Sequence, residues 1–151
     1  MTTRDELNTE LADHLMVCLA NATVLYHRSH GFHWNVVGPD FPEWHSKFEE
    51  IYEDIYSSLD PIAENLRKLG FVAPFCLWDL SEHATINDDF VESFDSSALV
   101  ENFRLANNAM IVCLNQSFSL AIAANQQGVA NFIAERIDMH QKWNWQLTVS
   151  L

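Results

Sequence analysis

The sequence predicts an all-α protein, a four-helix bundle with one short extra helix in a long middle connection. Three observations support this prediction: apolar residues recur at spacings of three and four, 48% of residues are hydrophobic, and only 4 Gly and 4 Pro interrupt the chain. This composition is typical of a few long helices joined by few turns. With 151 residues, the chain is expected to form a single domain, 1–151, with its own core.

The first two long helices are predicted over residues 3–33 and 41–69. Thr3, followed three residues later by Glu6, has the pattern of a capping box at the start of the first helix. A Gly-Pro pair breaks the chain between the two helices, and Gly70 is expected to end the second. Because the link is short, the two helices should be antiparallel neighbours.

The stretch 70–95 is too long to be a simple turn between helices. Within it, residues 77–84 read as one short helix. A connection of this length can run back along the whole bundle between the second and third long helices, as in four-helix bundles with one long crossover.

The last two long helices are predicted over residues 98–124 and 129–149. Ser96 or Ser97 is expected to cap the first of them, and Gly128 to separate the two. This second short link again predicts an antiparallel pair.

The charge balance is strongly acidic, with 21 Asp and Glu against 8 Lys and Arg and a net charge of −13. The basic residues are scattered and form no tail or stripe, so DNA binding is not expected. The polar N-terminus does not resemble a signal peptide, and no apolar run approaches the ~18 residues that a membrane span needs. We therefore expect a cytoplasmic protein with no membrane partner.

The three cysteines, Cys18, Cys76 and Cys113, are an odd number and contain no CxxC motif. Reduced thiols in the core of a cytosolic protein are the simplest interpretation of this pattern.

The second predicted helix carries two pairs of candidate metal ligands, His45 with Glu49 and Asp60 with Glu64. Each pair is spaced i, i+4 and so shares a helix face, and both pairs lie on one stripe. The pairs are separated by about 16 Å along the helix axis at ~1.5 Å per residue, so no single ion could contact both.

A twofold-related copy of this helix would resolve the separation. His45 and Glu64, and likewise Glu49 and Asp60, are equidistant from a point between residues 54 and 55. Two antiparallel copies crossing there would form two identical sites, each with one imidazole and three carboxylates. This ligand mixture suits iron or manganese better than zinc, which favours Cys and His in structural sites.

His33, at the end of the first helix, is expected to add a second imidazole, because antiparallel packing would place it near His45. Its neighbour Trp34 is a candidate electron donor to a redox metal. Taken one at a time, these residues have ordinary interpretations. His is often a packing or surface residue, Glu is usually solvated, and Asp60 before Pro61 could be a helix N-cap. The joint spacing is what favours a metal site.

The string HWNVVGPDFPEWHSKFEEIYEDIYSSLDPIAENLRKLG and the ending GVANFIAERIDMHQKWNWQL resemble the Dps family of miniature ferritins. The resemblance covers about residues 7–149. It implies a ferritin-like bundle and an intersubunit ferroxidase site, with His33, His45 and Glu49 from one subunit and Asp60 and Glu64 from its twofold mate. It also implies a hollow dodecamer that oxidises Fe(II), preferably with hydrogen peroxide, stores a ferric mineral and so limits oxidative damage.

Three departures from the family pattern are visible. Many members have Asp where this chain has Glu49, which offers the same carboxylate on a longer arm. Members that bind DNA usually carry a Lys-rich terminal extension, which is missing here. The stretch 125–131 carries amides where family members often place acids around threefold pores, so an iron route there is in doubt.

A second class of function stays open at the level of the sequence. The chain could be a ferritin-like shell or binding module whose metal site is structural or vestigial and does not turn over. A protein that binds the metal but does not oxidise it would support this alternative over a ferroxidase.

Overall fold

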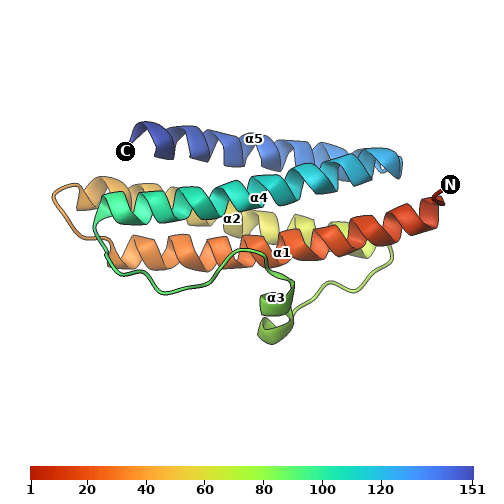
Figure 1. Cartoon of the computed structure of the whole chain (residues 1–151), viewed down its shortest axis with the longest axis horizontal. Coiled ribbons are helices and arrows are strands. Elements are labelled where there is room, and N and C mark those ends of the chain that lie inside the picture. Colours follow the sequence, from red (N-terminus) through yellow and green to blue (C-terminus); the bar gives the residue numbers. More distant parts are fainter.

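The computed structural model describes all 151 residues and contains five helices and no β-strand (Figure 1). Four long helices form the bundle, and a short one lies in the middle connection, as the sequence predicts. In chain order the helices are α1 Arg4–Asn35, α2 Phe41–Lys68, α3 Leu77–His83, α4 Ser96–Ala123 and α5 Gln127–Val149.

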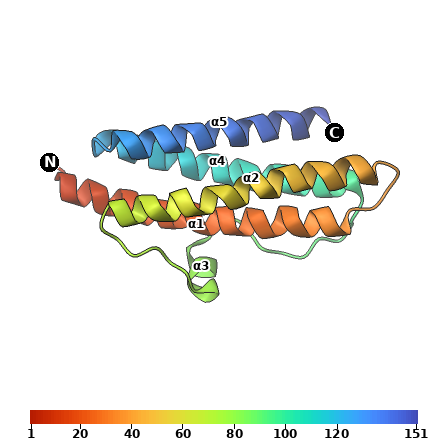
Figure 2. The ribbon, with the colours of Figure 1, turned by 180° about the vertical axis from the view of Figure 1, so that it is seen from behind.

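The bundle consists of two antiparallel hairpins, α1 with α2 and α4 with α5 (Figures 1 and 2). The long connection returns along the bundle, so that α4 runs parallel to α2. The helix α3 lies outside the bundle on the α1 side, as both views show. This is the single long crossover expected of a ferritin-like bundle.

The predicted capping box at the start of α1 is confirmed. The backbone N–H of Glu6 donates to the Thr3 hydroxyl at 3.1 Å, and the backbone N–H of Thr3 donates to the Glu6 carboxylate at 2.7 Å. Two donors that a helix start leaves unpaired are satisfied in this way. At the end of α2, Gly70 adopts a φ of 93°, a conformation that glycine accepts without steric cost.

Two predicted features of the later helix boundaries are wrong. The N-cap of α4 is Asp95 rather than Ser96 or Ser97, and the Ser96 hydroxyl instead donates to the Asp40 carboxylate at 2.8 Å. Gly128 does not separate α4 from α5 but lies in the first turn of α5. The turn is made by Asn125 at a φ of 57°, a conformation that Asn tolerates better than most residues.

The helix α2 continues through Pro61, so Asp60 does not restart it as an N-cap. Ile55 and Ile62, on either side of the proline, are both fully buried. A continuous helix keeps both side chains in the core, and this burial offsets the backbone hydrogen bond that proline cannot make.

One helix, α4, is long and apolar enough to cross a membrane by length and composition, with a mean hydropathy of 1.2 over 18 residues. This differs from the sequence expectation that no such stretch exists. In the structure Leu99, Phe103 and Met110 of α4 are buried in the bundle, and a core helix meets the same criterion.

Candidate metal centre

His33 and His45 are the two residues of the predicted site that contact each other directly. The C-terminal end of α1 and the first turns of α2 lie side by side because the α1–α2 link is short, and the two imidazole rings stack at 3.8 Å between centroids. The Nδ1 of His33 lies 2.6 Å from the carbonyl oxygen of His45, and the Nδ1 of His45 lies 2.7 Å from the carbonyl oxygen of His33. The two residues therefore hold each other in place.

These reciprocal bonds fix the tautomer of both rings. A carbonyl oxygen can only accept a hydrogen bond, so each Nδ1 must carry its proton and donate it. In the neutral form of each ring, Nε2 then has a free lone pair, and no hydrogen bond within the chain occupies either one. An imidazole whose Nδ1–H is anchored to a carbonyl is the usual form of a metal-ligating histidine.

The three predicted carboxylate ligands, Glu49, Asp60 and Glu64, lie along the face of α2 that the other helices leave uncovered. All three are exposed and none makes an ion pair or a side-chain hydrogen bond within the chain. No three His, Cys, Asp or Glu side chains of one chain are grouped closely enough to hold a metal ion. One subunit therefore brings the two imidazoles together but does not gather the carboxylates around them.

Aromatic side chains border the histidine pair. The ring of Tyr52 lies 5.3 Å from that of His33 and 4.2 Å from that of His30. Partial burial raises the pKa of Tyr52, and the charges of neighbouring carboxylates, first that of Glu49, raise it further. Burial lowers the pKa of His30, and its proximity to His33 lowers it further. Both rings therefore favour their uncharged forms.

Trp34, the candidate electron donor, is 62% exposed and packs on His30 at 4.2 Å between centroids. Its indole ring is connected to His33 through His30 rather than by direct stacking. Trp44, which flanks His45 in the sequence, packs instead on Phe48 in the core at 5.7 Å.

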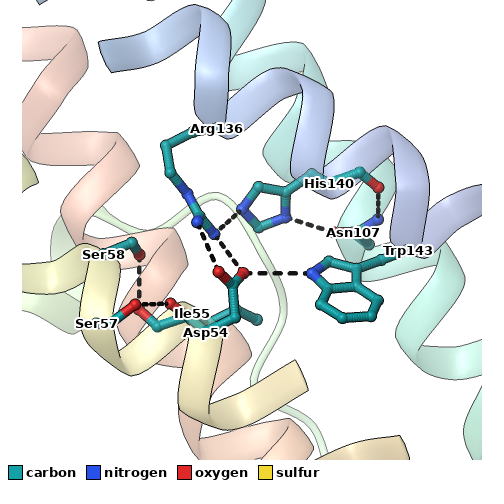
Figure 3. Close-up of polar contacts among 8 residues, drawn as sticks. All are labelled: Asp54, Ile55, Ser57, Ser58, Asn107, Arg136, His140 and Trp143. Atoms are coloured by element: carbon teal, nitrogen blue, oxygen red, sulfur yellow. Dashed lines mark hydrogen bonds and ion pairs between the residues drawn. The ribbon is translucent and has the colours of Figure 1, made fainter. Parts of the chain in front are cut away.

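A second polar cluster, which the sequence did not reveal, joins side chains of α2, α4 and α5 (Figure 3). The guanidinium of Arg136 donates to both carboxylate oxygens of Asp54, at 3.1 and 3.0 Å. The Trp143 indole N–H donates to the same carboxylate at 3.3 Å. We call the residues of this cluster, Asp54, Asn107, Arg136, His140 and Trp143, the core polar network.

His140 is the most deeply buried member of this network. Arg136 Nη2 lies 3.1 Å from His140 Nε2, and His140 Nδ1 lies 2.7 Å from Asn107 Oδ1. Because a guanidinium can only donate, Nε2 accepts and Nδ1–H donates to the Asn107 oxygen. Burial and the nearby Arg136 charge lower the pKa of His140 to about 3, so the ring is neutral at pH 7.

The sequence alone gives neither Arg136 nor His140 a partner. Their i, i+4 spacing among apolar residues of the last helix is the only sign of this cluster in the sequence. Trp143 is buried in the core, whereas Trp145 of the same helix is exposed.

Comparisons with known proteins agree with this architecture. The sequence profile of the ferritin-like domain matches residues 11–151. DNA protection during starvation protein 2 of Bacillus anthracis is 25% identical over 145 residues, 96% of this chain and 99% of that protein.

Solved structures give the same result. The Dps protein of Bacillus brevis superposes with a TM-score of 0.90 at 27% identity, covering 99% of this chain and 98% of that one. The Vibrio cholerae Dps protein, described as a member of a superfamily of ferritin-like diiron-carboxylate proteins, gives a TM-score of 0.90 at 26% identity, over 96% and 91% of the two chains.

The matched range and the crossover bundle define a ferritin-like protein. Within that class, the chain belongs to the Dps family.

Proposed function

We propose that two copies of this chain pair about a twofold axis near residues 54 and 55 and bind iron between them. Each of the two sites would contain His33, His45 and Glu49 of one subunit and Asp60 and Glu64 of the other. The observation that supports this most directly is the histidine pair, because both of its Nε2 lone pairs are free and next to a carboxylate-bearing face that no other helix of the chain covers.

The charge on this face supports a cation between the subunits. Glu49, Glu53, Asp60 and Glu64 are all exposed there and have no basic partner in the chain. Pairing two copies would bring eight such carboxylates toward one another, and like charges at close range oppose association. Metal ions bound between the subunits would neutralise this repulsion.

The proposed reaction is the oxidation of Fe(II), with hydrogen peroxide as the preferred oxidant. Two Fe(II) ions give one electron each, peroxide accepts both, and with two protons it becomes two water molecules. The carboxylates favour the ferric product because they are hard, charged oxygen ligands. Trp34 and the neighbouring aromatic rings would donate an electron where only one ferrous ion is present.

The product would be stored as a ferric mineral inside a hollow assembly of twelve subunits. Consuming iron and peroxide together would protect cytoplasmic components from oxidative damage. We do not include DNA binding in this function, since a chain of net charge −13 would be repelled by the phosphate backbone.

The test compares two double variants in an Fe(II) oxidation assay with peroxide. His45→Ala with Glu64→Ala removes one imidazole and one carboxylate from the proposed site and should reduce the oxidation rate to that of iron in buffer. The matched control is Glu10→Ala with His14→Ala, a Glu/His pair spaced i, i+4 on α1, and it should oxidise iron as wild type does.

Oxidation at the wild-type rate by the first variant would refute the site. A structural or vestigial site would give a different result: wild-type protein would bind the metal in anaerobic titration but would not accelerate oxidation when peroxide is added.

A further inference from the structure

Two cysteines face each other across the core, away from the proposed iron site. Cys18 of α1 and Cys113 of α4 are 95 positions apart in sequence, yet their Sγ atoms lie 2.7 Å apart. This is about 0.7 Å beyond the ~2.0 Å length of a disulfide bond. Neither sulfur has a role in the proposed iron chemistry, and the third cysteine, Cys76, is half-buried without a thiol partner.

We propose that Cys18 and Cys113 are a redox-active dithiol that reduces hydrogen peroxide without iron and closes to an internal disulfide between α1 and α4. The activity is separate from iron oxidation, because it needs no metal and no partner subunit.

The two sulfurs are not equivalent. Hydrogen bonding between them lowers the pKa of Cys113 and raises that of Cys18, because the thiol that donates holds its proton and the sulfur that accepts is stabilised as a thiolate. Cys113 is also the more accessible of the two, with 4% of its surface exposed against 0% for Cys18. Cys113 is therefore the attacking sulfur and Cys18 the resolving one.

The reaction is balanced in two steps. The Cys113 thiolate attacks one peroxide oxygen, the O–O bond breaks, and the departing hydroxide takes a proton to become water, which leaves a sulfenic acid on Cys113. Cys18 then attacks that sulfur, the S–S bond forms, the S–O bond breaks, and the Cys18 proton leaves with the hydroxyl group as a second water. Two thiols are oxidised, and one peroxide is reduced to two waters.

Ser117 supports the second step by its position. Its hydroxyl lies 3.3 Å from Cys18 Sγ and donates to the Cys113 carbonyl at 3.0 Å. Because its one proton is used in that bond, the Ser117 oxygen can only accept a hydrogen bond from the Cys18 thiol, and it offers that thiol an acceptor once Cys113 has been oxidised.

The test uses the full-length, chelator-treated assembly carrying Cys76→Ser, so that iron and disulfides through Cys76 are both absent. After incubation with peroxide, the protein is unfolded and its free thiols are alkylated and counted by mass spectrometry. We expect both remaining thiols to be lost and the intact mass to fall by two hydrogen atoms, with both changes reversed by a dithiol reductant.

The matched variant is Cys18→Ala with Cys76→Ser, which leaves Cys113 without a resolving partner. It should show no disulfide and should instead give a Cys113 sulfenic acid that a dione reagent traps. This sulfenic acid should form more slowly than the disulfide of the Cys76→Ser protein, because the hydrogen bond from Cys18 that lowers the pKa of Cys113 is lost. Two alkylatable thiols after peroxide treatment of the Cys76→Ser protein, or a disulfide formed only between subunits, would refute the proposal.

The outcome is independent of the proposed iron chemistry. A protein that oxidises no iron could still lose both thiols to peroxide, and a variant without cysteines should oxidise Fe(II) as fast as wild type. A slower rate in the cysteine-free variant, with its helix content unchanged by circular dichroism, would show that the dithiol does not act separately and would contradict the proposal.

Discussion

The core polar network gives the sharpest prediction about stability. Asp54→Ala removes the carboxylate that pairs with Arg136, whose side chain is only 9% exposed. The guanidinium would then remain buried without a counter-ion, and the Trp143 indole N–H would lose its acceptor. Breaking a buried ion pair by removing one partner costs about 3–5 kcal/mol.

The structure places this case near the lower end of the range. The Asp54 side chain is 21% exposed, so water can reach the guanidinium partly after the carboxylate is gone, and we expect a loss of about 3 kcal/mol. Arg136→Met leaves the carboxylate, which water reaches more easily, and should cost about 1–2 kcal/mol. The double variant replaces the pair by apolar groups and should lie within about 1 kcal/mol of wild type.

The assay is urea-induced unfolding followed by circular dichroism, at one fixed protein concentration because assembly contributes to the apparent stability. The four proteins form a double-mutant cycle, whose interaction energy should exceed about 2 kcal/mol. Thr9→Ala, which removes an exposed hydroxyl, is a suitable control. If Asp54→Ala costs less than about 1 kcal/mol, or the double variant is less stable than Asp54→Ala, the network does not act as described.

Three further predictions concern other parts of the chain. The pKa of His140 is lowered to about 3 in the folded protein, against ~6.5 in the unfolded chain. Between about pH 6.5 and about pH 3 the unfolded chain therefore binds a proton at His140 that the folded protein does not bind. The free energy of unfolding should fall by up to about 4 kcal/mol as pH falls through this range. His140→Leu should flatten that dependence in pH-resolved unfolding; an unchanged slope would contradict the assignment. Thr3→Ala should cost about 1 kcal/mol locally, seen as faster amide exchange in the first turn of α1 but not in the middle of that helix. Glu49→Asp should retain most of the Fe(II) oxidation rate, whereas Glu49→Gln should lower it by about 10-fold or more; equal rates for the two would remove Glu49 from the site.

The sequence was most informative where a regular pattern repeats. The stripe of α1 and the spacing of ligands on α2 follow from helix geometry, so the long helices, the crossover and the face shared by the candidate ligands were predictable. The capping box at Thr3 was predictable for the same reason, since both of its partners lie within one turn.

Features that depend on contacts between helices were not predictable. Asp54 meets Arg136 only because α2 and α5 pack together, and the cysteine pair exists only because α1 and α4 do. The reciprocal bonds of His33 and His45 are a further example, since the sequence indicated their proximity but not the tautomer that frees both Nε2 atoms. The residue that makes a turn was also predicted wrongly, since Asn125 and not Gly128 makes the turn between α4 and α5.

Subunit complementation tests most directly whether two chains complete each metal centre. One variant carries His45→Ala and Glu49→Ala, the other carries Asp60→Ala and Glu64→Ala, and each alone should be inactive. When the two are co-expressed in equal amounts, half of the twofold dimers are mixed and each mixed dimer has one intact site of two. Recovery of about a quarter of the wild-type Fe(II) oxidation rate is expected, and no recovery from a mixed assembly verified by native mass would contradict a site shared between subunits.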